Sequence, residues 1–385
     1  MTLPATLVIG IIIFTGFICG ELARKIKLPK VTGYILAGIL LNPGFFPFIP
    51  GQFVAHTELI TNISLAVITF SIGGMLFSSR LKKLGKGILY ITLAEAEGAF
   101  LAVVAGFLIM TPLLIHFLGA EWAKFFLPVS LVIGAMGSPT DPSATLAVML
   151  EYHAKGDVSS TIMGVAAFDD ALGIMNYSLA LAAANVLLTP EGFTLTSALL
   201  KPSGVILGGL ALGIAFGLGF NLLTLFIKKE TEGVFIVVIL SLLLLCFGCA
   251  ALLGLDELLA TMMMGVVVVN FNKSREKIFQ ILERYTDEFV FVLFFTISGM
   301  HLNLASLSTL YIPVVLFVVF RALGKFMGTM MGASLAKSSP AVRKYTAGGL
   351  IPQGGIVVGL ALMARQNPAL KAMADTLISI IIGAT

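Results

Sequence analysis

Long apolar runs cover almost the whole chain, and they limit the possible folds more than any other feature. Of the 385 residues, 58% are hydrophobic and only 11% are charged. A soluble domain of this composition has too few polar side chains to cover its surface, whereas about 20 apolar residues suffice to cross a hydrocarbon core about 30 Å thick. The sequence therefore predicts an all-α polytopic membrane protein.

Polar, proline and glycine breaks divide the apolar runs into thirteen expected transmembrane segments. Their limits are 5–23, 31–49, 56–79, 87–112, 123–150, 158–188, 202–227, 233–248, 250–271, 287–306, 311–336, 342–364 and 369–385. The cysteines and histidines show no ligand spacing typical of a metal site and no catalytic pattern. We therefore expect no cofactor and no enzymatic activity.

Lysine and arginine are distributed unevenly between the connecting loops. One set of alternate loops holds 18 of the 24 basic residues, and the opposite set holds four. Because positively charged loops stay in the cytoplasm, the N-terminus is expected outside the cell (inner) membrane and the C-terminus in the cytoplasm. The net charge of +4 therefore reflects orientation in lipid and does not indicate a nucleic-acid partner. The last segment ends while still apolar, which suggests that a cytoplasmic C-terminal domain is missing.

Charged side chains inside the expected segments are the strongest functional signal. Each should cost at least a few kcal/mol at mid-bilayer unless it is paired or hydrated. Two bases against five acids leave three carboxylates that must hold protons, bind cations or contact water. The acids are Glu95, Glu97, Asp141, Asp169 and Asp170, and the bases are Arg321 and Lys325.

The two bases lie four residues apart on one helix face, which is unfavourable unless counter-charges lie opposite. Asp169 can neutralise one base and a glutamate the other. Glu95 and Glu97 point about 200° apart on a helix, so only one of them can serve. We expect that glutamate to pair with Arg321. A buried ion network that only holds helices together is the alternative, and the excess of acids over bases argues against it.

Two expected segments contain sequences that interrupt a helix at mid-membrane. Proline removes hydrogen-bond donors and glycine loosens the backbone, and non-helical backbone at that depth is tolerated where it lines a site. The residues concerned are Pro139, Thr140, Asp141 and Pro142 in GAMGSPTDPSATLAV, and Pro352 and Gln353 in TAGGLIPQGGIVVGLAL. The interrupted segments are the fifth and the twelfth, seven positions apart, so the units that contain them enter the membrane from opposite sides. This is the pattern of an inverted repeat.

Together these motifs resemble the monovalent cation:proton antiporter superfamily, and specifically its NapA/NhaA-like branch. The similar stretches are KLPKVTGYILAGILLNPG, SPTDPSA, AAFDDALGI, RALGKFMG and PQGGIVVGLAL. The resemblance implies an NhaA-like fold of thirteen helices with inverted repeats, two broken crossing helices and a homodimer in membrane lipid. It also implies a dimerisation domain, a core ion-transport domain and a linking helix, at residues 1–79 with 233–306, 87–188 with 311–385, and 202–227.

The resemblance implies roles for several site residues. Asp170 is similar to the aspartate that carries the ion and the proton, and Asp169 to the neighbour that pairs with a lysine at the position of Lys325. Thr140 and Asp141 are similar to the polar pair at the broken helix. Na⁺ is expected at Asp170 and Asp169. Arg321, one turn before Lys325, resembles the arginine of the electroneutral branch, so the chain mixes features of both branches.

The expected function is secondary antiport of Na⁺ or Li⁺ against protons, in pH homeostasis. If an arriving cation draws Asp169 away from Lys325, the lysine also gives up its proton, and two protons cross for each Na⁺. That exchange would be electrogenic. A K⁺/H⁺ antiporter is the alternative within the class. A Na⁺-coupled organic-acid symporter of the same fold and a passive channel are alternatives from other classes.

Overall fold

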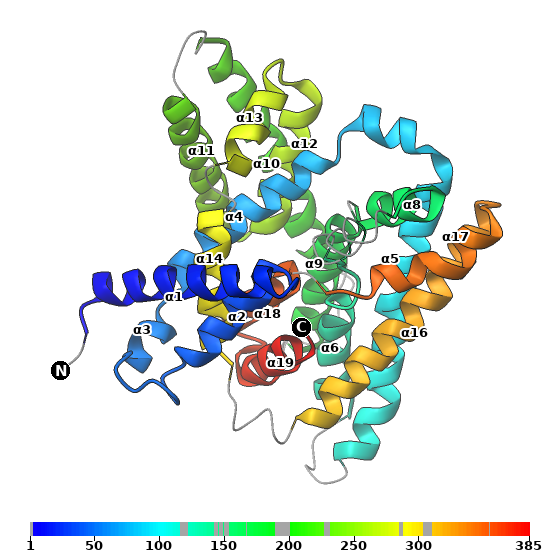
Figure 1. The fold of residues 1–385 in the computed structure, drawn as a ribbon, viewed down its shortest axis with the longest axis horizontal. Coiled ribbons are helices and arrows are strands. Elements are labelled where there is room, and N and C mark those ends of the chain that lie inside the picture. Colours follow the sequence, from blue (N-terminus) through cyan, green and yellow to red (C-terminus); the bar gives the residue numbers. More distant parts are fainter. Residues whose placement is uncertain are drawn as a thin grey trace. The chain divides into compact units, whose positions relative to one another are not determined.

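The computed structural model describes residues 3–115, 122–141, 145, 149, 154–166, 168–188, 201–226, 232–284, 288–302, 310–353 and 355–385. Over these residues its regular structure is entirely helical. The chain divides into two compact units, each built from two stretches that are distant in the sequence (Figure 1). Unit 1 comprises Met1–Phe77 and Gly208–Asn303, and unit 2 comprises Ser78–Leu207 and Leu304–Thr385.

Unit 1 is built around two pairs of closely packed helices. α2 packs against α14, and α4 packs against α12. At both crossings glycines remove side chains from the contact: a Cβ on Gly38 would lie 2.0 Å from the carbonyl oxygen of Thr296, and one on Gly73 would lie 2.0 Å from that of Met262. The helices are α1 (Ala5–Lys25), α2 (Lys30–Leu40), α3 (Gly51–Ala55), α4 (Glu58–Met75), α11 (Glu232–Leu253), α12 (Glu257–Phe271), α13 (Arg275–Leu282) and α14 (Glu288–Met300). α10 (Lys201–Phe226) begins in unit 2 and continues into unit 1.

Unit 2 holds all the charged residues that the sequence places inside the membrane. Its most extensive helix contact joins α5 and α16, which run side by side (Figure 1). α6 packs against α9, and α18 against α19. The elements are α5 (Ser78–Ile115), α6 (Trp122–Ala135), α8 (Asp157–Ala166), α9 (Asp169–Leu188), α16 (Tyr311–Leu335), α17 (Pro340–Tyr345), the 3₁₀ helix η3 (Thr346–Leu350), α18 (Gly355–Gln366) and α19 (Lys371–Ala384).

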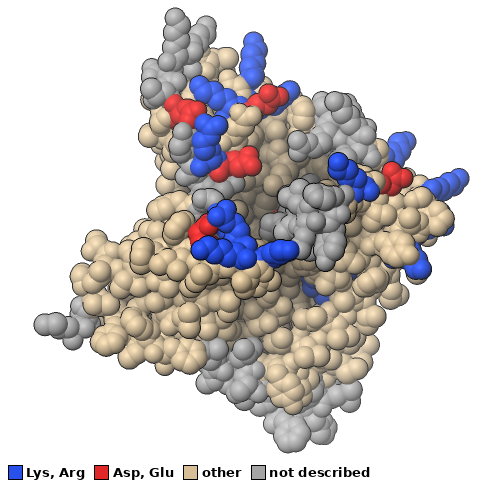
Figure 2. Space-filling view, viewed as in Figure 1, with Lys and Arg blue, Asp and Glu red and all other residues tan. Residues whose placement is uncertain are grey.

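The helices are those of a multi-pass membrane protein. Among the described residues, seven helices are long and apolar enough to cross a bilayer, and six further apolar helices are shorter. Large apolar side chains are strongly exposed, including Phe14, Leu252 and Met327. On the face drawn in Figure 2, most of the surface carries neither basic nor acidic side chains. The expected number of thirteen spans stays a prediction.

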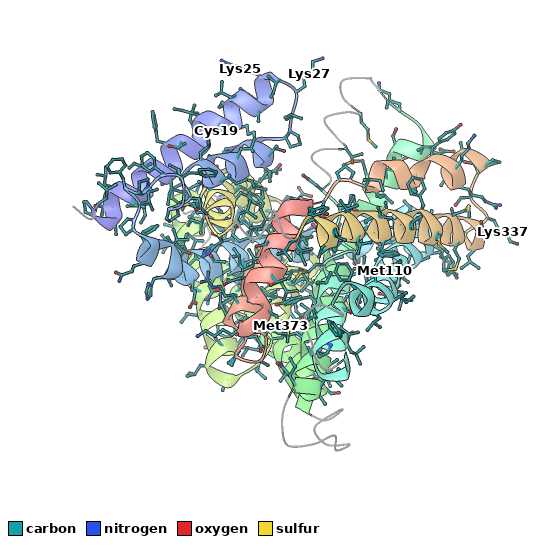
Figure 3. All side chains as sticks on the ribbon, turned by 90° about the horizontal axis from the view of Figure 1, so that it is seen from below. Cys19, Lys25, Lys27, Met110, Lys337 and Met373 are labelled. Atoms are coloured by element: carbon teal, nitrogen blue, oxygen red, sulfur yellow. The ribbon has the colours of Figure 1, made fainter. Side chains whose placement is uncertain are left out.

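Basic side chains mark the ends of two of these helices. Arg24 and Lys25 lie in the last turn of α1 and Lys27 follows it, while Lys337 follows the end of α16 (Figure 3). Cations at a helix C-terminus interact favourably with its partial negative charge. All four belong to the loops that the sequence assigns to the cytoplasmic side.

A seam of glycines brings α5 and α16 into backbone contact. A Cβ on Gly98 would lie 2.8 Å from the carbonyl oxygen of Gly324, and a Cβ on Gly328 would lie 2.1 Å from that of Ala94. Small residues allow this close approach between helices in lipid. The seam matters for function because Glu95 and Lys325 lie directly beside these glycines and face each other across it.

Widening the seam should destabilise unit 2. A Gly328→Ala side chain has no space beside Ala94, so we expect its free energy of unfolding to fall by about 1–3 kcal/mol, as for other overpacked cores. Gly248→Ala is the matched control, because nothing lies within 4 Å of the added Cβ in α11. Thermal unfolding in detergent measures both changes. Equal melting temperatures for the two variants would contradict the account of the seam.

Candidate functional site

Asp169 and Asp170 lie in the first turn of α9. The sequence predicts one segment over 158–188 with the aspartates about midway along it. In the structure, α8 ends at Ala166 and a new helix begins at Asp169. The N-terminus of a helix carries a partial positive charge that stabilises carboxylates. The local structure therefore explains how two adjacent acids are accommodated inside a membrane protein.

Lys325 lies between two carboxylates and is fully buried with both of them. Its Nζ contacts Oε1 of Glu95 and lies 3.7 Å from Oδ2 of Asp169. It also donates hydrogen bonds to the carbonyl oxygen of Ser138 at 2.7 Å and to Oγ1 of Thr140 at 2.9 Å. Thr140 in turn donates to Oδ2 of Asp169. The ammonium thereby joins α5, the first helix break, α9 and α16.

Arg321 is also buried, with 4% of its surface exposed, and it contacts backbone carbonyls. Its guanidinium donates to Gly137 at 3.0 Å, to Pro139 at 2.7 Å and to Ile351, and more weakly to Pro352 at 3.4 Å. The first two carbonyls belong to the interrupted stretch after α6, and the last two to the stretch after η3. One side chain therefore ties the two helix breaks together.

The expected pairing of Arg321 with a glutamate is wrong. Glu95 contacts Lys325, and Glu97 is half-buried on α5. The physical reason is that the two interruptions leave carbonyl oxygens without helical donors at the depth of the site. A forked guanidinium satisfies several of them at once, which leaves Glu95 to the compact ammonium. A count of acidic and basic side chains alone does not reveal that backbone carbonyls serve as the partners of Arg321.

Both interrupted stretches are non-helical in the structure. α6 ends at Ala135, and the chain from Ser138 to Asp141 is irregular. η3 ends at Leu350, and α18 begins at Gly355. Pro142 lies outside the described residues.

The two stretches are also hydrogen-bonded to each other. The backbone N–H of Asp141 donates to the carbonyl oxygen of Pro352 at 3.0 Å, and the Thr145 hydroxyl donates to that of Gly349 at 2.7 Å. Gln353 is half-buried beside Pro352. These bonds satisfy backbone groups that a continuous helix would have satisfied internally.

The two aspartates each keep a buried oxygen that is available for a ligand. Within the described part of the chain, Oδ1 of Asp169 and Oδ1 of Asp170 accept no hydrogen bond. A buried carboxylate oxygen without a donor is costly. A proton or a bound cation stabilises such an oxygen, because hard cations prefer oxygen ligands. The site therefore presents an acceptor-rich environment at the N-terminus of α9.

Two polar residues of the site were missed by the sequence reasoning. The Ser138 hydroxyl donates to the carbonyl oxygen of Ala96 at 2.9 Å and receives a hydrogen bond from Asn176 at 3.4 Å. Asn176 is buried two turns after Asp169 on α9. The available signal was this spacing, since residues seven apart share one face of a helix.

Comparison with known proteins defines the class of this membrane protein. The family model described as "Sodium/hydrogen exchanger, transmembrane" matches residues 10–385. The chain therefore belongs to the transmembrane sodium/hydrogen exchanger family, a family of ion antiporters, and the resemblance drawn from its motifs is confirmed.

Particular relatives cover most of the chain at low identity. A Na⁺/H⁺ antiporter of Enterococcus hirae is 21% identical over 92% of this chain and 90% of its own length. The ammonium/H⁺ antiporter subunit AmhT of Alkalihalophilus pseudofirmus is 23% identical over 86% of this chain and 79% of its own. The sodium proton antiporter MjNhaP1 of Methanocaldococcus jannaschii superimposes with a TM-score of 0.76 at 20% identity, covering 99% of this chain and 93% of MjNhaP1. At this identity the structural likeness establishes the fold.

Replacing Arg321 by lysine should destabilise the site, although the charge is kept. A single ammonium cannot present the planar fork that reaches both breaks. Each buried carbonyl left without a donor costs about 1–3 kcal/mol, so we expect a clear fall in melting temperature. Arg284→Lys, at a side chain that is 65% exposed, is the control and should change little. An Arg321→Lys variant as stable as the wild type would contradict the role given to the hydrogen bonds between Arg321 and the two helix breaks.

Proposed function

We propose that the chain exchanges Na⁺ or Li⁺ for protons by letting the two ions occupy Asp170 in turn. The observation that carries this proposal is a charge balance. Four charged side chains of the cluster are almost completely buried, namely Glu95, Asp169, Arg321 and Lys325. Two are acidic and two are basic, so they neutralise one another. Asp170 is a further carboxylate beside this neutral group, and it needs a positive ion of its own.

Competition for one carboxylate couples the two gradients. A proton on Asp170 must leave before a cation can use both carboxylate oxygens, and the cation must leave before the proton returns. Asp169 has a buried Oδ1 at the same helix end, and it supplies the second carboxylate of the expected Na⁺ site. Thr140 and Asp141 lie at the neighbouring break and supply further oxygens. An empty site would leave an uncompensated buried charge, which disfavours return without an ion.

We further propose the family architecture for the regions that surround the site. Residues 87–188 and 311–385 form the ion-transporting core, residues 1–79 and 233–306 form the dimerisation domain of a homodimer, and residues 202–227 link them. Thirteen helices in inverted repeats place the N-terminus outside the inner membrane and the C-terminus in the cytoplasm. The core moves relative to the dimerisation domain to expose the site alternately. Support comes from the distribution of basic residues and from the two hydrogen-bonded helix breaks within unit 2.

Cation preference and stoichiometry are parts of the same proposal. Oxygen ligands at Asp169 and Asp170 suit Na⁺, Li⁺ or K⁺, so K⁺/H⁺ exchange stays the alternative within the class. A Na⁺-coupled organic-acid symporter would move Na⁺ without counter-transport of protons. Electrogenic exchange with two protons per cation stays a prediction. It assumes that Lys325 gives up its proton when Asp169 turns to the cation, while Glu95 stays in contact with Lys325.

Asp170→Asn should abolish cation-dependent proton movement. The amide binds neither a proton nor Na⁺ with the affinity of a carboxylate, so we expect flux at the level of protein-free liposomes. Proteoliposomes with an entrapped pH dye, challenged in turn with Na⁺, Li⁺ and K⁺, measure the flux and the cation preference. Asp375→Asn is the control, because that side chain is 77% exposed on α19. Substantial Na⁺-dependent flux in a folded Asp170→Asn protein would refute the assignment.

A further inference from the structure

A groove runs along the surface of unit 2 where α5 and α16 meet. Its volume is about 490 Å³, and sites for small molecules occupy about 300–1,000 Å³. Gly324 and Gly328 are buried at its floor, where they carry no side chain to fill the space. Met327, Met330 and Met331 also line it, and their side chains are 56–66% exposed. The groove therefore opens onto the surface of the protein between flexible apolar walls.

The walls of the groove offer no polar partner to a ligand. Among the described residues that line it, Ser334 alone has a polar side chain, and its hydroxyl donates to the carbonyl oxygen of Met330 at 2.7 Å. Methionine side chains are unbranched and adapt their shape to an apolar surface. The chemistry of the groove therefore fits a flexible hydrocarbon chain better than a polar metabolite.

Two exposed lysines lie at one end of the same helix pair. Lys86 precedes Gly87 on α5, and Lys337 follows Ala336 at the end of α16 (Figure 3). A Cβ on Gly87 would lie 3.6 Å from the Cβ of Ala336, so the two helix ends are in contact. Neither lysine forms an ion pair with another residue in the part of the chain that the structure describes. Two positive charges therefore lie together at the end of the glycine seam.

The groove lies within the depth of one leaflet from these charges. At about 1.5 Å per residue, Ser334 lies about 5 Å and Gly324 about 20 Å from Lys337 along the axis of α16. Half of a hydrocarbon core about 30 Å thick is about 15 Å. A lipid whose head group contacts the lysines therefore has its acyl chains beside the groove. Both lysines belong to the loops that the sequence assigns to the cytoplasmic side, and the cytoplasmic leaflet carries anionic lipids.

We propose that an anionic phospholipid binds along this groove, with its phosphate at Lys86 and Lys337 and one acyl chain between the methionines. Charge complementarity selects this occupant over a neutral lipid. A transmembrane helix of a partner, or of a second copy of the chain, would need small residues for close contact. Here Gly324 and Gly328 are already in contact with the backbone of α5. The proposal concerns lipid binding and does not depend on which ion Asp170 carries.

Quenching of tryptophan fluorescence by brominated lipids tests this proposal. Trp122 is the single tryptophan of the chain, so Trp122→Phe combined with Met327→Trp places one reporter at the groove. The protein is reconstituted in equal parts of phosphatidylcholine and phosphatidylglycerol, and one or the other lipid is brominated on its acyl chains. Because two basic residues lie near the head group, we expect an apparent affinity about five-fold or more higher for phosphatidylglycerol.

Two results of this measurement would overturn the proposal. Equal quenching by the two brominated lipids would mean ordinary contact with bulk lipid. Quenching by neither lipid would mean that a second copy or another protein covers the groove. Should the Met327→Trp protein not fold, Met331→Trp places the reporter on the next turn of the same wall and is read in the same way.

Matched variants assign the preference to this site. Lys86→Gln with Lys337→Gln should remove the preference and leave quenching by brominated phosphatidylcholine unchanged. Lys25→Gln with Lys27→Gln removes the same charge from the end of α1 and should retain the preference. A reporter at Ile109, which is 63% exposed further along α5, should show none. A preference that survives in the Lys86 and Lys337 variant, or that both lysine variants lose equally, would refute the site.

Discussion

The buried ammonium of Lys325 is the interaction on which the rest of unit 2 depends. It donates hydrogen bonds to Glu95 on α5 and to Ser138 and Thr140 in the interrupted stretch after α6. Thr140 in turn donates a hydrogen bond to Asp169 on α9. Removing one partner from such a group would leave a buried charge uncompensated. The glycine seam between α5 and α16 lies beside this ion pair, because Gly328 of α16 packs directly against Glu95 of α5.

Arg321 performs the complementary task with the backbone. Two interrupted helices leave carbonyl oxygens without donors from their own helix. The guanidinium donates to carbonyls of both interruptions, and a backbone hydrogen bond between Asp141 and Pro352 closes the contact. With the two bases committed in this way, the strongly buried charges balance. Asp170 remains as the carboxylate whose positive partner can change, which is the requirement for an exchanger.

Much of this arrangement could be predicted from the sequence, and the errors have a common cause. Hydrophobicity predicts a multi-pass helical membrane protein, and proline and glycine mark the two non-helical stretches, because these signals are local. The helix end before Asp169 carries no such mark. The partners of Arg321 and Lys325 depend on which face of α16 meets α5, and a spacing of four residues does not determine that. Gly98, Gly324 and Gly328 carried the missing information, since they mark the face that touches α5.

The central claim is that a proton and a cation compete for one carboxylate, Asp170, beside a group of buried acids and bases whose charges balance. It is tested most directly without a membrane, by adding Na⁺ to the purified protein in weakly buffered detergent solution. The protons released are followed with a pH indicator dye and the bound Na⁺ by calorimetry. The account predicts that Na⁺ binding releases protons from the wild-type protein. Na⁺ binding without proton release would contradict it.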